Sequence, residues 1–152
     1  MEIRDGDLGD PAVAELLRLH LDSMAALSPA DSMHALDRFG LGAPGISFWT
    51  AWDGAALLGC AALNALGADE GEIKSMRTAP AHLRKGVATA LLDQIISVAR
   101  ARGYRRLNLE TGTGPAFAPA HAVYRRYGFK ECGAFADYPN DDPFSSFMSL
   151  AL

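Results

Sequence analysis

The segment from Glu72 to Leu92 constrains the fold of this chain more than any other. Its residues predict a short strand that stops at Pro80, a basic turn over residues 84–86, and then a strongly apolar helix. In such a unit, the unpaired backbone N–H groups and the positive end of the helix dipole point in the same direction. The segment therefore predicts an anion-binding site at the N-terminus of the helix.

The chain has the length and composition of one globular domain, which we assign to residues 1–152. Hydrophobic residues make up 49% and charged residues 21%, which is typical of a chain that buries roughly two-thirds of its unfolded surface. The net charge of −4 argues against nucleic-acid binding, because the basic residues are too few to cover a phosphate backbone. Any anion site is therefore expected to hold one small anionic group rather than an extended phosphate backbone.

Neither a metal centre nor a membrane segment is expected. The two cysteines, Cys60 and Cys132, lack the spacing of a zinc site or a disulfide framework. No apolar run approaches the ~20 residues of a spanning helix, and the first residues do not form an apolar signal region. We therefore expect a cytoplasmic protein without a metal and without a membrane partner.

Apolar periodicity and turn residues predict a strand, two helices, three strands, a helix, a strand, a helix and two final strands. The expected helices cover residues 10–26, 28–40, 87–102 and 119–127. The expected strands cover residues 2–4, 47–52, 55–66, 72–78, 105–111, 131–136 and 146–152, with Asp53-Gly54 as a hairpin turn. This order indicates an α/β or α+β domain with a mixed sheet.

Two motifs within this order resemble those of a known family. The run Leu83-Arg84-Lys85-Gly86-Val87-Ala88 is similar to the pattern Arg/Gln-x-x-Gly-x-Gly/Ala of the GCN5-related N-acetyltransferase (GNAT) superfamily. The run from Ala120 to Phe129 resembles its second pattern, Ala-x-x-x-Tyr-x-x-x-Gly-Phe. The resemblance spans Glu72 to Phe129. It implies a mixed, mostly antiparallel sheet of six to seven strands flanked by about four helices.

The chain departs from the family pattern at two positions. The first motif position, usually Arg or Gln, is Leu83, and the Asn that many members carry before the second motif is Phe117. No side-chain contact can be carried over to either position. A backbone cradle at the helix N-terminus does not depend on these side chains.

The resemblance implies that acetyl-CoA is the co-substrate and that its acetyl group passes to a primary amine. Backbone groups at the end of the strand would pair with the pantetheine arm, and the turn and helix start would hold the pyrophosphate. The implied cofactor-binding residues are Met76, Arg77, Thr78, Arg84, Lys85, Gly86, Val87, Ala88 and Thr89. The alternative for the turn is a solvated basic cap of the helix, without a ligand.

Tyr124 occupies the position of the family's general acid, four residues before Gly128. A tyrosine with a pKa near ~10 would pass its proton to a CoA thiolate of about 8.5, uphill by ~1.5 units or about 2 kcal/mol. The alternative role for Tyr124 is packing between helix and sheet. His121 lies three residues before Tyr124 and is the one histidine worth testing.

Glu72 is the candidate general base, at the spacing before Gly86 that some members of the family show. On a strand, Glu72 and Lys74 share a face, so an ordinary salt bridge is the alternative for both. Glu110 ends the strand beside the cleft and is a second candidate. A water relay is the third route for the amine proton, because a carboxylate is a weak acceptor unless burial raises its pKa.

The acceptor is expected to enter between the first two helices (residues 23–34) and the polar loop 137–145. A small-molecule amine is the expected acceptor, and metabolites, amino acids, antibiotics, polyamines and protein N-termini all fit the sequence. Trp49, Trp52 and the apolar last strand are compatible with a homodimer. The rival function is a non-catalytic acyl-CoA-binding or sensor domain on the same fold.

Overall fold

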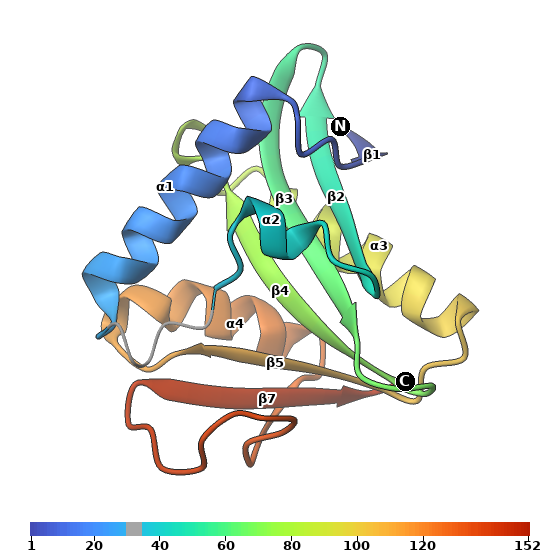
Figure 1. Cartoon of the computed structure of the whole chain (residues 1–152), viewed down its shortest axis with the longest axis vertical. Coiled ribbons are helices and arrows are strands. Elements are labelled where there is room, and N and C mark those ends of the chain that lie inside the picture. The colour runs from blue at the N-terminus through green and yellow to red at the C-terminus, as the bar shows by residue number, and fades with distance from the viewer. Residues whose placement is uncertain (30–34) are drawn as a thin grey trace.

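The computed structural model describes residues 1–29 and 35–152, except for the side chain of Phe39. Within this part, seven strands form one sheet in the order β1-β2-β3-β4-β5-β7-β6 (Figure 1). All neighbouring strands are antiparallel except β4 and β5. The strands are β1 (Glu2–Asp5), β2 (Ile46–Asp53), β3 (Ala56–Ala65), β4 (Glu70–Thr78), β5 (Arg106–Gly112), β6 (Lys130–Cys132) and β7 (Ser145–Ala151). The predicted mixed, mostly antiparallel sheet is confirmed.

Helices cover both faces of this sheet. They are α1 (Pro11–Leu27), α2 (Arg38–Leu41), α3 (Val87–Ala101) and α4 (Ala118–Arg126), with 3-10 turns at Pro80–His82 and Pro115–Phe117. One core cluster joins α1 and α2 to β2 and β3, and a larger one joins α3 and α4 to the opposite face. The α1 and α2 side is the near side in Figure 1. None of the described helices is long and apolar enough to cross a membrane.

The first helix begins where the sequence predicts. The Asp10 carboxylate accepts a hydrogen bond from the Ala12 amide at 2.8 Å, and Pro11 occupies the first helical position. The prediction of a second helix over residues 28–40 is wrong in its described part, because residues 35–37 are not helical. The described part of the predicted helix contains only α2. Residues 30–34 of the predicted helix lie outside the described residues.

Two strand predictions need correction. Asp53 pairs with Ala56, so the hairpin loop consists of Gly54 and Ala55 and lies one residue later than predicted. Gly54 has φ +57°, which suits glycine at the first loop position. The predicted strand 131–136 is reduced to Lys130–Cys132. Ala136 has φ +50°, which takes the chain out of the extended region.

The helix after the basic turn packs closely on the sheet. The helix is apolar as predicted, and its buried residues are Val87, Leu91, Leu92, Ile95, Ile96 and Ala99. Gly59 on β3 permits this contact, because a Cβ there would lie 2.7 Å from a methyl carbon of Val87 and 2.7 Å from the carbonyl oxygen of Arg77. The N-terminus of α3 is thereby held against the end of β4.

Candidate active site

The central feature of the site is a cleft that opens where β4 and β5 separate. Their parallel pairing runs only from Glu70–Arg106 to Ile73–Leu109. Beyond this point β4 continues along β3, and β5 continues along β7. The cleft measures about 900 Å³ and is lined by α1, the end of β4, the start of α3, the end of β5 and α4.

A bulge in β4 turns the strand away at this point. Two residues, Ser75 and Met76, face one residue of β3, because the register shifts between Cys60–Arg77 and Ala62–Lys74. Ser75 has φ +53°, an unfavourable backbone conformation for a residue with a side chain. The bulged stretch of β4 has no strand partner on its cleft side within the described residues.

The start of α3 forms one end of the cleft. Gly86 precedes the helix with φ +79°, and Arg84 also has a positive φ of +62°. In the described part of the chain, no side chain caps this helix, so the amides of its first turn keep their donors. A Cβ placed on Gly86 would meet nothing within 4 Å, so the space above the turn is open. Open space, unpaired amides and the positive helix end together fit an anionic group.

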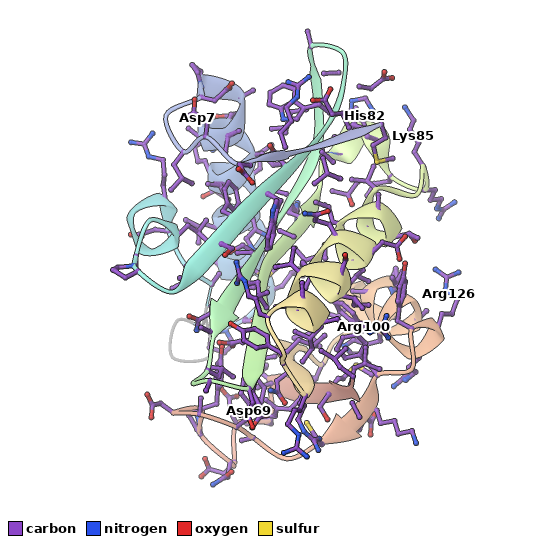
Figure 2. The ribbon with its side chains drawn as sticks, turned by 90° about the vertical axis from the view of Figure 1, so that its right-hand side faces the viewer. Asp7, Asp69, His82, Lys85, Arg100 and Arg126 are labelled. Carbon is purple, nitrogen blue, oxygen red and sulfur yellow. The ribbon has the colours of Figure 1, made fainter. Side chains whose placement is uncertain are left out.

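The basic side chains of this turn lie at the surface. Figure 2 shows Lys85 and His82 in the turn before α3, where the Lys85 ammonium lies 3.2 Å from the His82 ring nitrogen Nδ1. Arg84 is exposed and lines the cleft together with Arg126 of α4. Leu83, the first departure from the family pattern, is 59% exposed. The unpaired donors at this end of the cleft therefore belong to the backbone of the turn and not to a side chain at position 83.

The three predicted residues at the end of β4 point in different directions. Met76 packs against the core on the α3 side. Arg77 reaches the opposite side, where its Nη2 donates to Ser23 of α1 at 2.9 Å. Thr78 is the last residue of β4 and pairs with Gly59.

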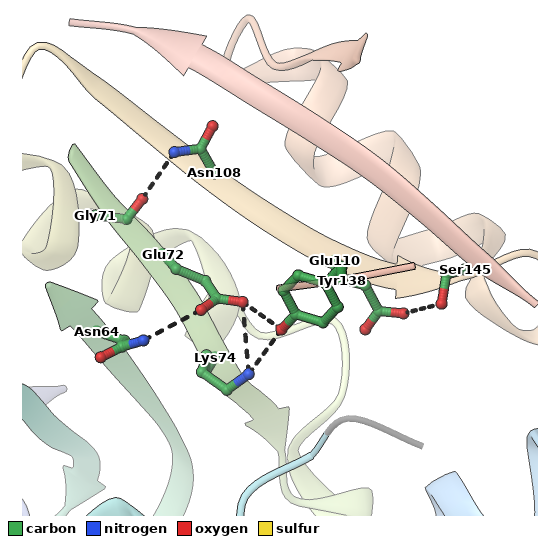
Figure 3. A network of polar contacts seen from close by, with 8 residues as sticks. All are labelled: Asn64, Gly71, Glu72, Lys74, Asn108, Glu110, Tyr138 and Ser145. Carbon is green, nitrogen blue, oxygen red and sulfur yellow. Dashed lines mark hydrogen bonds and ion pairs between the residues drawn. The ribbon is translucent and has the colours of Figure 1, made fainter. Parts of the chain in front are cut away.

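Glu72 lies at the centre of a buried polar network (Figure 3). Only 3% of the residue is exposed. Its carboxylate accepts hydrogen bonds from Asn64 at 3.2 Å and from the hydroxyl of Tyr138, and it lies 3.5 Å from the Lys74 ammonium. Lys74 also donates to the Tyr138 hydroxyl oxygen at 2.8 Å. The salt bridge expected as the alternative is thus present, within a larger network.

Tyr138 keeps its proton in this network. Burial, followed by the hydrogen bond to Glu72 and the negative charges of Glu72 and Glu110, raises the pKa of Tyr138 far above its ordinary value. The protonated hydroxyl therefore remains a donor to the Glu72 carboxylate. This hydrogen bond connects the segment between β6 and β7, which carries Tyr138, to Glu72 on β4.

Tyr124 enters the cleft from the other side of the sheet. It lies on α4, is 7% exposed, and packs edge to face on Phe129 at 5.6 Å between ring centres. Burial raises the pKa of Tyr124 to about 12. Proton transfer to a thiolate of about 8.5 is then uphill by ~3.5 units, or roughly 5 kcal/mol, rather than the smaller gap expected from the sequence. A thiolate buried beside it loses hydration as well, which narrows the gap.

The structure therefore places the two predicted catalytic residues on opposite faces of one opening. Glu72 alternates with Ile73, which packs on the α3 side, so Glu72 faces α1. Tyr124 belongs to the α3 side core. Both residues line the same cleft.

Other residues of the site were not predicted from the sequence. Tyr138 and Asn64 contact Glu72, and His20 of α1 is buried at the cleft wall. Only the apolar spacing of α1 identified His20 as inward-facing, and no sequence pattern placed Tyr138 against β4. Glu110, in contrast, was predicted as the second carboxylate; it lines the cleft on the Glu72 side and accepts a hydrogen bond from Ser145 at 2.7 Å.

Two residues near Tyr124 contact the end of β5. The His121 ring nitrogen Nε2 lies 2.9 Å from the carbonyl oxygen of Gly112, which fixes the ring against the strand. The ring of Phe117, the second departure from the family, lies against Gly112, where a Cβ would come within 2.1 Å of it. Phe117 thus supplies an apolar wall of the cleft in place of an amide.

The chain is similar to known proteins over its whole length. A family model described as "Acetyltransferase (GNAT) family" matches residues 13–129. The chain is 49% identical to the N-acetyltransferase YsnE of Bacillus subtilis, with 100% of both proteins covered. It is 47% identical to the N-acetyltransferase YedL of Escherichia coli, over 99% of this chain and 94% of that protein.

A solved structure shows the same fold. It is a GNAT family acetyltransferase from Elizabethkingia anophelis with acetyl-CoA bound. It is 19% identical to this chain, covers 99% of this chain and 97% of its own, and superposes with a TM-score of 0.68.

Proposed function

The chain belongs to the acetyltransferase (GNAT) family and is an acetyl-CoA-dependent N-acetyltransferase, and from this premise we propose its substrates and mechanism. The acetyl group passes from acetyl-CoA to a primary amine of a small molecule or peptide, by direct attack within a ternary complex. The observation that carries this proposal is the placement of Glu72 and Tyr124 on opposite faces of one cleft.

The donor binds along the α3 side of the opening. Backbone groups of Met76, Arg77 and Thr78, on the edge of β4 turned away from β3, pair with the pantetheine arm as an added strand would. The amides from Arg84 to Thr89 hold the pyrophosphate at the positive end of α3. The bound acetyl-CoA of the Elizabethkingia protein, which shares the fold, supports this assignment.

The acceptor approaches from the α1 side, where Glu72 and Glu110 provide negative charge. The amine nitrogen attacks the thioester carbonyl carbon, so a C–N bond forms and the C–S bond breaks. Glu72 takes up the amine proton, directly or through water, and Glu110 is the alternative acceptor. Tyr124 donates its proton, or a strong hydrogen bond, to the thiolate that leaves on the other face.

A screen of amines tests this proposal. The purified protein is mixed with acetyl-CoA and each member of a panel of amino acids, polyamines, aminoglycosides and peptides, and free thiol is followed. We expect acceptor-dependent thiol release with at least one primary amine, together with a product heavier by one acetyl group. Acetyl-CoA binding without acceptor-dependent release across the panel would contradict the proposal and favour the rival function of an acyl-CoA-binding domain.

A further inference from the structure

Three buried polar atoms of residues that line the cleft lack hydrogen-bond partners in the described part of the chain. They are Nδ1 of His20, Oγ of Ser75 and Nε of Arg77. His20 is 7% exposed and Ser75 is 8% exposed, and all three residues line the cleft. Because native proteins pair almost all buried polar groups, three unpaired atoms in one cleft indicate a ligand or ordered water at this place.

His20 and Arg77 meet at the contact between α1 and β4. Arg77 reaches from β4 to Ser23, which lies three residues after His20 and so on the same face of α1. Burial, with a smaller contribution from the Arg77 charge, lowers the pKa of His20 to about 4. His20 is therefore neutral at pH 7. Ser75 lies in the bulge two residues before Arg77, and its carbonyl oxygen accepts from the Cys60 thiol at 3.4 Å.

Arg77 lines the cleft and has no carboxylate partner in the described part of the chain. Arg18 and Arg125 pair with carboxylates at the surface, and Lys74 pairs with Glu72. Within residues 1–29 and 35–152, Arg77 has a serine hydroxyl as its side-chain partner and forms no ion pair. A guanidinium with an unused inner N–H matches the two oxygens of a carboxylate better than it matches a neutral group.

We propose that the acceptor carries a carboxylate, bound by Arg77 with His20 and Ser75, so that the substrate is a free amino acid or related amino-carboxylate. This inference rests on the proposed function, because it names the acceptor of that reaction. The carboxylate binds at the α1 end of the cleft, while the amine points toward the network of Glu72 and Tyr138. The neutral imidazole and the hydroxyl group donate to the carboxylate oxygens without adding charge.

Matched acids and esters test the carboxylate. The common free amino acids, β-alanine and 4-aminobutyrate are compared with their methyl esters, and the ratio of kcat/KM for acid over ester is measured. In the wild type, the acid is the better substrate of a pair. Arg77→Gln lowers this ratio about 10- to 100-fold, which corresponds to the loss of a hydrogen bond to a charged group. Arg77→Lys recovers part of the ratio, because it restores the charge.

The control is Arg18→Gln, an exposed arginine on α1 that faces away from the cleft, which leaves the ratio unchanged. If Arg77→Gln does not fold, His20→Gln replaces it, with an expected loss in the ratio of about threefold to tenfold. Esters that outperform their acids, or a ratio unchanged in the folded variants, would overturn the inference.

A binding measurement separates this inference from the proposed function. The protein is labelled with ¹⁵N-histidine, and the His20 imidazole signal is followed by NMR while acetate is added. A saturable shift in the wild type that is lost in Arg77→Gln supports the carboxylate site, even if no amine is acetylated. The absence of a saturable shift would mean that only water hydrogen-bonds to the three unpaired atoms. The inference is then wrong, even if turnover with other amines upholds the proposed function.

Discussion

The hydroxyl group of Tyr138 donates a hydrogen bond to the buried carboxylate of Glu72, across 66 residues of sequence. Tyr138 lies between β6 and β7, whereas Glu72 lies on the central strand β4. Phe135 and Phe147 pack edge to face on the Tyr138 ring, so the ring is fixed as well as the hydroxyl. The loop that carries Tyr138 therefore forms a defined wall on the acceptor side of the cleft.

We expect Tyr138 and Glu72 to be coupled in stability. Each single change, Tyr138→Phe or Glu72→Gln, leaves a buried polar group with one partner fewer, so the second change costs less than the first. A double-mutant cycle on the free energy of unfolding, measured in urea, should give a coupling of about 1–3 kcal/mol. Additive effects, within about 0.5 kcal/mol, would show that the hydrogen bond contributes nothing specific to stability.

The substitution Glu72→Gln should lower kcat about 100-fold, because an amide of the same shape cannot accept the amine proton. The KM for acetyl-CoA should change by no more than about twofold, since the donor binds on the other side of the opening. Free thiol release measures both constants. The control is Glu131→Gln, a surface carboxylate paired with Arg125, which should leave both constants unchanged. Full kcat in Glu72→Gln would show that Glu110 or water, and not Glu72, accepts the amine proton.

Gly86 offers a test of the donor site with a matched control at the other end of α3. Gly86 and Gly103 have φ values of +79° and +78°, and a Cβ on either meets nothing within 4 Å. An alanine at each position should cost a similar backbone strain of about 1–2 kcal/mol in thermal unfolding. Only Gly86→Ala should raise the KM for acetyl-CoA, by about tenfold, because its methyl group occupies the space over the helix amides. Equal KM values for acetyl-CoA in the two variants would show that the pyrophosphate does not bind at this turn.

His20 should make the protein less stable in acid. The pKa of His20 is about 4 in the folded chain, against an ordinary value of 6.5 for histidine, so the unfolded state binds the proton more tightly. The contribution of neutral His20 to the free energy of unfolding is therefore fully present above pH 6.5. It is lost as the pH drops toward 4, by about 3 kcal/mol in total. The free energy of unfolding, measured in urea without acceptor from pH 7 to 4, should decline less in His20→Gln than in the wild type. Parallel curves would show that His20 is not buried in its neutral form.

The sequence predicted the parts of the structure that depend on local patterns. The apolar stripe from Val87 to Ile96 and the proline and glycine positions set the elements around the donor end of the cleft, because these effects act within a few residues. The same Ser-Pro start signal at residues 28–29 misled the prediction of the second helix, since residues 35–37 are not helical and the described part contains only α2.

The acceptor side could not be predicted in the same way. The Tyr138–Glu72 contact depends on how a loop folds back over the sheet, and no local pattern encodes it. The raised pKa of Tyr124 likewise results from burial between α4 and its neighbours. The unpaired atoms of His20 and Arg77 become visible only when α1 is placed on β4.

The turnover of Tyr124→Phe tests the central claim most directly, since that claim is that acetyl transfer uses a proton donor on the α4 side of the cleft. Tyr104→Phe is the control, because Tyr104 is buried to a similar extent in the same core but does not line the cleft. With an accepted amine, Tyr124→Phe should lower kcat about 100-fold while the Kd for acetyl-CoA from calorimetry stays within about twofold, and Tyr104→Phe should retain kcat. Full turnover by Tyr124→Phe with unchanged acetyl-CoA binding would contradict the claim.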